Sequence, residues 1–238
     1  MSFSYGAKIV TDGLVFYVDA ANPNSYVSGS TTVDSLVSNV TGSLSNDTDF
    51  STDNQGVWVF DGVDDNITTP YNDILDITSI TIQCWLNLTG AQQLYPTVFG
   101  RAGGGSAAYK IRTYGGVGSD IGLQIYDSTY RQGPKLTTGV SGKDLNYGEW
   151  NFLSFSYDYN SIDGQRFKVY LNGVLDSQST TGVGTIVNTS QTMEFMESDF
   201  DSNSNLAGSL GPCNIYNREL TSTEVLQNYN ALKGRFGL

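Results

Sequence analysis

The sequence predicts an all-β protein, a two-sheet antiparallel sandwich of the jelly-roll type with one short C-terminal helix. Many short segments alternate apolar and polar residues with a period of two, which is typical of half-buried strands. Turn-forming residues separate these segments, and the 238 residues include 27 glycines. No internal repeat or change of composition divides the chain. We therefore expect one domain, residues 1–238, with residues 1–12 as an N-terminal arm.

The clearest strand pattern lies between residues 150 and 175. Apolar side chains occupy alternate positions in 150–159 and again in 166–171. The dipeptide Asn172-Gly173 then favours the two-residue turn of a β-hairpin. These features predict an antiparallel meander with one buried face. By the same criteria we expect further strands at 14–19, 56–61, 64–68, 80–88, 97–101, 109–114, 121–127, 192–197 and 206–216. The polar stretch 34–54 is expected to form long loops with one short edge strand.

One helix is predicted near the C-terminus, over residues 222–233. Thr221 and Glu224 have the spacing of a capping box, in which each side chain bonds the backbone of the other residue. Gly234 is expected to end the helix. The helix should bury one apolar stripe, made by Val225, Leu226, Tyr229 and Leu232.

Charge and composition exclude several classes of function. The net charge is −12, from 12 basic and 24 acidic residues, which argues against nucleic acid and anionic membranes as partners. No apolar run reaches the length of a membrane span. The chain has no histidine, so the Ser-His-Asp arrangement and most zinc sites are excluded. The N-terminal residues do not resemble a signal peptide.

The chain has two cysteines, Cys84 and Cys213, each within an expected strand. We interpret them as buried thiols that act as small apolar residues. A disulfide between neighbouring strands is the alternative.

Several segments, in this order, carry a resemblance to a known family. They are Gly13–Pro23, Phe60–Asp65, Glu149–Phe152, Val169–Gly173, Gly208–Gly211, Ile215–Thr221 and Glu224–Tyr229. Together they resemble the concanavalin A-like, laminin-G-like jelly-roll superfamily, most of all the versions in structural proteins of tailed phages. The resemblance implies the jelly-roll fold and a place in a virion that is assembled in the host cytoplasm. The fold alone does not fix the function.

Glycoside hydrolysis would need two carboxylates that flank the scissile bond. Glucanases of this fold carry them as Glu-x-Asp-x-x-Glu on one strand. The nearest segment here begins at Glu194, but Met196 stands where the pattern has Asp. Glu194 and Glu197 are three residues apart and would face opposite sides of a regular strand. We therefore expect no enzyme.

Two kinds of binding site remain as hypotheses, each against the alternative of ordinary sheet tyrosines or solvated polar turns. A glycan site could use Tyr126, Asp127, Tyr130 and Arg131, which combine aromatic rings with planar polar groups. Calcium is the one cofactor that we consider, because oxygen ligands alternate at Asp199, Asp201, Asn203 and Asn205. A second acidic loop contains Asp61, Asp64 and Asp65.

Two functions follow as hypotheses. The first is a non-enzymatic virion structural protein of a tailed phage, for capsid decoration or in the tail. It would bind other virion proteins and copies of itself through its loops and terminal arm. The alternative is a lectin-like adhesion module for cell-surface glycans, with or without calcium.

Overall fold

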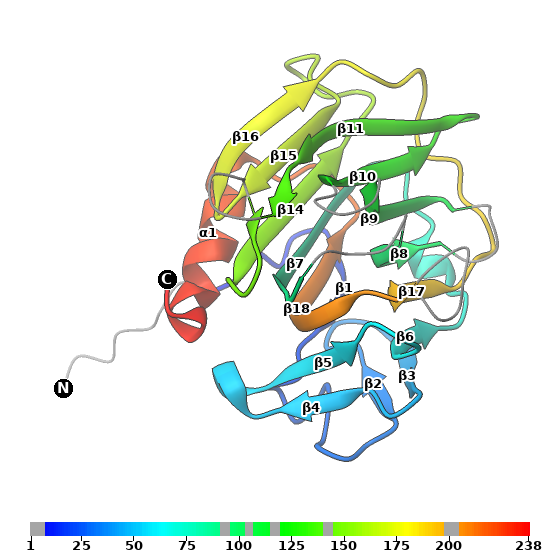
Figure 1. Ribbon diagram of the computed structural model, residues 1–238. Coiled ribbons are helices and arrows are strands. Elements are labelled where there is room, and N and C mark those ends of the chain that lie inside the picture. The colour runs from blue at the N-terminus through cyan, green and yellow to red at the C-terminus, as the bar shows by residue number, and fades with distance from the viewer. Residues whose placement is uncertain (1–7, 91–95, 103–106, 115–119, 140–144, 198–204) are drawn as a thin grey trace.

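The computed structural model describes residues 8–90, 96–102, 107–114, 120–139, 145–197 and 205–238 (Figure 1). Two large antiparallel sheets pack face to face, and one α-helix lies against the first sheet, on the side away from the second. The predicted two-sheet sandwich with a short C-terminal helix is confirmed.

The first sheet has the order β16-β15-β14-β7-β18-β5-β4, with β1 also paired to β18. Its strands are β16 (Val174–Ser179), β15 (Phe167–Leu171), β14 (Asn151–Tyr157), β7 (Ile80–Leu88), β18 (Ala207–Tyr216), β5 (Val57–Asp61), β4 (Asp49–Ser51) and β1 (Leu14–Val18).

The second sheet has the order β11-β10-β9-β8-β17-β6-β3-β2. Its strands are β11 (Tyr130–Leu136), β10 (Asp120–Tyr126), β9 (Tyr109–Tyr114), β8 (Thr97–Arg101), β17 (Met193–Glu197), β6 (Asn66–Thr69), β3 (Thr41–Ser45) and β2 (Thr32–Asp34). Two short strands, β12 (Thr138–Gly139) and β13 (Leu145–Asn146), pair in parallel. Two 3₁₀ turns, η1 (Asp53–Gln55) and η2 (Asp73–Leu75), join strands.

The main core lies between the two sheets. Phe99 of β8 stacks on Phe195 of β17 with ring centroids 4.7 Å apart, and Phe16 of β1 packs on both rings from the first sheet. The predicted hairpin is present, because β14 pairs with β15 and Asn172 and Gly173 both have positive φ in the turn that leads into β16. All residues of β14 are buried, however, and not only alternate ones. The first sheet is therefore covered on both faces.

A second hydrophobic core covers the outer face of the first sheet. Trp85 of β7 stacks on Phe236, with ring centroids 4.1 Å apart, and on Tyr229 of the helix at 5.8 Å. Trp150 also packs against Phe236, with ring centroids 4.6 Å apart. The C-terminal segment thus closes the hydrophobic surface that the outward side chains of β7 and β14 present.

The helix α1 (Ser222–Leu232) matches the expected bounds within one residue and has the predicted capping box. A hydrogen bond from Arg218 is the main cause that lowers the pKa of Glu224 in this box to about 2. Gly234 does not end the helix, because a 3₁₀ turn, η4 (Lys233–Phe236), continues it and the left-handed residue is Gly237. The apolar stripe also differs: Leu226 is exposed, and the polar Asn228 is buried in its place.

Asn228 is buried because it completes a hydrogen-bond network beneath the helix. Its side-chain oxygen accepts from the Val10 amide at 2.8 Å, and its side-chain nitrogen donates to Gln83 Oε1 at 2.8 Å and to the Tyr216 hydroxyl at 2.9 Å. Tyr216 in turn donates to the Val10 carbonyl at 2.9 Å. Of the expected N-terminal arm, the part from residue 8 to residue 12 is therefore held against the helix and β18. Residues 1–7 lie outside the described residues.

The stretch 34–54 holds more strand than expected. It contains β3 and β4, and β2 ends at its first residue. These strands are short and polar; β2 and β4 lie at the edges of the two sheets and β3 lies next to an edge, where few side chains need to be apolar. Within the described residues, no helix is long and apolar enough to cross a membrane.

Replacement of Phe236 by Ala tests the second core. We expect Phe236→Ala to lower the free energy of unfolding by about 3 kcal/mol, because it removes a buried ring that stacks on Trp85. The matched control is Leu226→Ala, which truncates an exposed side chain of the same segment and should change stability by less than about 0.5 kcal/mol. Denaturant titration measures both, and equal effects of the two changes would contradict the assignment.

Candidate functional site

The outer face of the second sheet carries an ordered set of polar side chains. In β10, Ile121, Leu123 and Ile125 belong to the main core. Alternation therefore places Gln124 and Tyr126 on the opposite face. We call this outer surface of β8–β11 and β17 the polar face.

Strand register aligns the polar face in rows, because residues directly opposite each other share one side of a sheet. The first row runs through consecutive partners: Gln132, Gln124, Lys110, Gly100 and Glu194. Gly100 has positive φ, and a Cβ there would lie 2.4 Å from the Cα of Lys110. Only glycine fits at this point, so no side chain stands in the row between Lys110 and Glu194.

The second row runs through Lys135, Gly122, Arg112, Thr97 and Glu197. Arg112 donates to Gln124 Oε1 at 2.9 Å, which links the two rows. The Lys135 ammonium lies 4.1 Å from the ring centroid of Tyr114, over the same face. The polar face thus combines amides, cations and carboxylates at fixed positions.

The expectation that Glu194 and Glu197 face opposite sides of β17 is wrong. Met196 has a φ of 59°, and Met193, Phe195 and Met196 all point into the main core. The strand therefore loses its alternation after Phe195. Glu197 pairs with Thr97 in the second row, so both carboxylates lie on the polar face.

Exposure divides the polar face into two parts. Its centre is buried: Lys110, Arg112, Gln124 and Glu194 are each 9% exposed or less. The side formed by β11 is open, where Tyr130 is 42% exposed and Gln132 is also exposed. A ligand would first meet the β10–β11 hairpin.

The sequence-predicted glycan residues lie at the tip of this hairpin but do not all point the same way. Tyr126 and Tyr130 are opposite partners with ring centroids 5.2 Å apart, and they belong to the polar face. Asp127 is buried instead, where it accepts from Arg131 Nε at 3.0 Å and from the Val183 amide at 2.7 Å. Burial raises the pKa of Asp127, but these hydrogen bonds outweigh burial and hold it below its usual value. Asp127 and Arg131 therefore fix the hairpin, and the two tyrosines form the surface.

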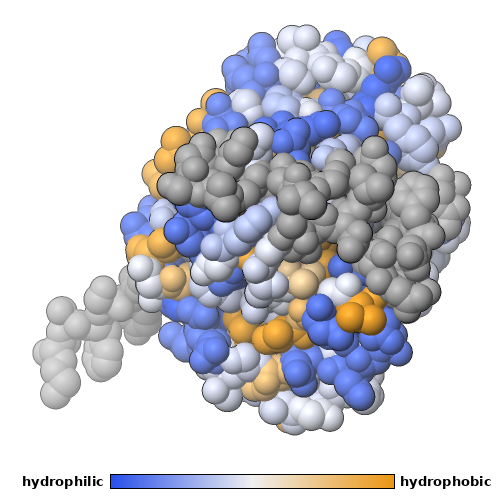
Figure 2. Space-filling view, viewed as in Figure 1, coloured by the Kyte–Doolittle hydropathy of each residue, from blue (hydrophilic) through white to orange (hydrophobic). Residues whose placement is uncertain are grey.

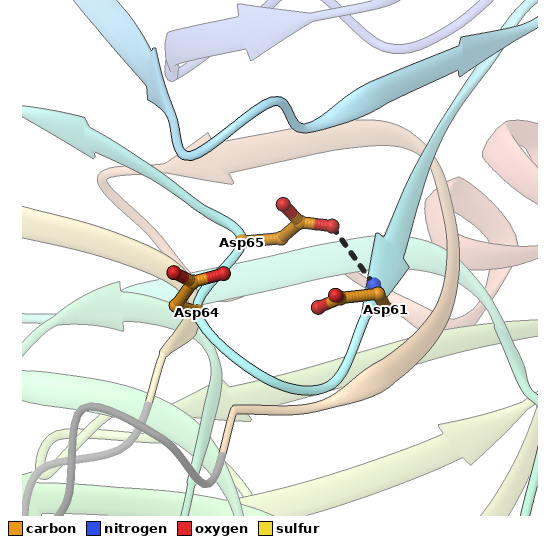
Figure 3. Close-up of side chains that lie close together, drawn as sticks. All are labelled: Asp61, Asp64 and Asp65. Atoms are coloured by element: carbon orange, nitrogen blue, oxygen red, sulfur yellow. Dashed lines mark hydrogen bonds between the residues drawn. The ribbon is translucent and has the colours of Figure 1, made fainter.

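A cluster of three carboxylates lies on a different rim of the sandwich (Figure 3). Asp61 ends β5, and Asp64 and Asp65 precede β6; one carboxylate oxygen of each lies within 4.8 Å of the others. Asp65 is buried and accepts from the Asp61 amide at 2.9 Å, as Figure 3 shows. Burial is the main cause that raises the pKa of Asp65, and the charges of Asp61, Asp64 and Asp49 add to it.

The predicted calcium loop reaches this cluster at one end. Asp199, Asp201 and Asn203 lie outside the described residues. Asn205 is buried, and its side-chain nitrogen donates to the Asp65 carbonyl at 3.0 Å. Of the residues proposed for the calcium loop, Asn205 therefore lies beside the three-carboxylate cluster, which no local sequence signal could indicate.

The visible surface outside the residues drawn in grey is mostly hydrophilic, with hydrophobic residues in small separate groups (Figure 2). A polar ligand fits such a surface better than an extended apolar one.

Asp65→Asn tests the electrostatics of the three-carboxylate cluster. Because the folded-state pKa of Asp65 is raised, its ionisation destabilises the fold at neutral pH, and this penalty disappears as the pH falls through the folded-state pKa. We expect Asp65→Asn to raise the melting temperature at pH 7. Mild acidification should then raise the melting temperature of the variant less than that of the wild-type protein. Asp176→Asn, at an exposed residue of β16, is the control. A loss of stability at pH 7 in calcium-free buffer would contradict this account.

Comparison with solved structures supports the fold. The chain aligns with a ligand-binding domain of botulinum neurotoxin serotype D in complex with N-acetylneuraminic acid, at a TM-score of 0.68 and 15% identity. That alignment covers 92% of this chain and 50% of the toxin domain. The binding domain of serotype G aligns at a TM-score of 0.67 and 16% identity, and the alignment covers 91% of this chain and 50% of that domain. The chain thus spans about half the length of these toxin domains.

A third similar structure is almost completely covered. Domain 4 of AbnA, an extracellular GH43 arabinanase from Geobacillus stearothermophilus, in complex with arabinotriose, aligns at a TM-score of 0.64 and 16% identity. The alignment covers 91% of this chain and 98% of that domain. No curated protein sequence matches the chain.

A family model of the concanavalin A-like lectin/glucanases superfamily, of the third laminin G type, matches residues 61–226. This is more than half of the 238 residues, and it includes all strands of the polar face. The chain therefore belongs to the concanavalin A-like lectin/glucanases superfamily.

Proposed function

We propose that the protein is a non-enzymatic, lectin-like module that binds carbohydrate on the polar face. The observation that carries this proposal is the Tyr126–Tyr130 pair, which lies on the same face and the same two strands as the planar amides of Gln124 and Gln132. The open side of the polar face receives the ligand. In the buried centre, the protein's own polar side chains are held in place by one another.

The chemistry of this surface suits a sugar ring. A pyranose has an apolar face that packs on an aromatic ring, and its hydroxyls both donate and accept hydrogen bonds. Gln132 follows the tyrosine pair on β11, is exposed, and offers one acceptor and two donor hydrogens. Its partner Gln124 on β10 is buried and accepts from Arg112, so it belongs to the ordered centre of the face. The open side of the polar face, with these groups, would take a saccharide along the β10–β11 hairpin.

The similar structures support the proposal by precedent for the fold. The structure of the toxin domain contains N-acetylneuraminic acid, and that of the arabinanase domain contains arabinotriose. Identities of 15% and 16% carry no residue correspondence, so the site proposed here rests on the polar face of this chain.

We infer that the polar face binds and does not hydrolyse. Glu194 and Glu197 share the face, which is the one feature in favour of a glycosidase. Glu194 is only 9% exposed, however. Met196, where glucanases of this fold have an Asp, belongs to the main core. A bound saccharide is therefore expected to be released without cleavage.

Tyr130→Ala tests the proposed site. A glycan array, with and without calcium, first identifies a ligand. We then expect Tyr130→Ala to weaken binding of that ligand roughly tenfold, about 1.4 kcal/mol, because the aromatic platform is lost. Tyr71→Ala is the matched control, since Tyr71 is 44% exposed and Tyr130 is 42% exposed. No retention of any glycan, or equal affinities of the two variants, would overturn the proposal.

Our second proposal concerns the particle on which the protein acts. The resemblance to tailed-phage structural proteins supports a place on a virion, as a capsid decoration or tail-associated protein. In that case the purified protein should co-sediment with virions or with their capsid or tail subcomplexes. Sedimentation with an unrelated phage is the control, and failure to bind any subcomplex of the matching phage would rule this setting out.

A further inference from the structure

The two cysteines, the only ones in the chain, meet in the middle of the first sheet. Cys84 on β7 and Cys213 on β18 are register partners in neighbouring antiparallel strands. Both are fully buried, and both belong to the main core, so their side chains leave the sheet on the same side.

This placement meets the Cα criterion for a disulfide. Opposite residues of an antiparallel pair have Cα atoms about 4.5 to 5.5 Å apart. Disulfides span Cα separations of about 4.4 to 6.8 Å. Burial raises the pKa of Cys84 to about 12, and the nearness of Cys84 adds to the rise that burial causes at Cys213. The two thiols are thus adjacent and protonated in the folded protein, in which both are free.

We propose that Cys84 and Cys213 are a redox pair, which a low-molecular-weight disulfide converts to a cross-strand disulfide between β7 and β18. One cysteine thiolate attacks the small disulfide, forms a mixed disulfide and releases one small thiol. The second cysteine thiolate attacks the protein sulfur of that mixed disulfide and releases the second small thiol. The protein loses two electrons and two protons, and the small disulfide is reduced to two thiols.

The burial of both sulfurs decides when this exchange happens. A small disulfide does not reach a fully buried thiol, so exchange takes place while the chain folds, before β7 and β18 are enclosed. After folding, the same burial protects the bond from reductants. The bridge would close the chain between residues 84 and 213, which contains every strand of the polar face. It would therefore link the two ends of the segment that forms the polar face, whether or not that face binds carbohydrate.

The test is refolding under redox control. Reduced, denatured protein is refolded in a mixture of reduced and oxidised glutathione, and a second sample is refolded in reduced glutathione alone. Both are then denatured, alkylated with iodoacetamide and weighed by intact-mass spectrometry. We expect the first sample to be monomeric, two hydrogens lighter and without label, and the second to carry two alkyl groups, one for each cysteine.

Single variants separate the pair from nonspecific oxidation. Cys84→Ser and Cys213→Ser each leave one thiol, which should end as one alkyl group or one glutathione adduct. If a variant does not fold, the wild-type masses still decide. Two labels, two adducts or a disulfide-linked dimer in the oxidised wild-type sample would overturn the proposal, and the thiols would then be apolar core residues only.

Discussion

The covering of the first sheet by the C-terminal segment determines which surfaces remain for function. Asn228 holds the N-terminal segment, β7 and β18 together through hydrogen bonds to Val10, Gln83 and Tyr216. Phe236 fills the hydrophobic surface around Trp85. Because every polar group of Asn228 has a partner, a buried amide is stable there, whereas a lost partner would leave an unsatisfied group in the core. With this face closed, the outer face of the second sheet and the loops are the surfaces left for ligands.

The polar face differs from an ordinary solvated sheet surface. Charged groups at its centre are largely buried, and burial of charge is unfavourable unless each group is engaged by others. Lys110, Arg112 and Glu194 each take part in further interactions, so they are held in place. Such groups lose little freedom when a ligand arrives, which reduces the entropic penalty of binding. The exposed Tyr130 and the half-buried Tyr126 supply apolar contact next to this ordered centre.

Local sequence patterns predicted the features that depend on neighbouring residues. Alternation located β14 and β15, Asn172-Gly173 located the turn between β15 and β16, and Thr221 with Glu224 located the start of the helix. Features that depend on distant pairing were missed. The positive φ of Met196 moved Glu197 to the face of Glu194, and no local signal marks that residue. The burial of Asn228 was also missed, because its partners, Val10 and Gln83, lie far away in the chain.

For the proposed site, too, only the part that depends on neighbouring residues could be predicted. Tyr126 and Tyr130 could be proposed because, together with Asp127 and Arg131, they combine aromatic rings and planar polar groups at the end of a predicted strand. The rows that extend from them across β9, β8 and β17 depend on strand order and register, which a single sequence does not reveal. The pairing of Cys84 opposite Cys213 also depends on strand order and register.

The two proposed roles, glycan binding and a place on a particle, are linked because a site that binds weakly needs many copies to hold its ligand. A shallow sheet face with one aromatic pair makes few contacts, so a single copy would bind a saccharide weakly. Many copies in fixed positions turn later binding events into intramolecular ones, and avidity then rises by orders of magnitude without new contacts. A repeating cell-surface polysaccharide offers the matching array of ligands. Weak, repeated binding on a rigid sheet face is therefore what a module displayed in many copies would need, whereas a module that acts alone would need a deeper site.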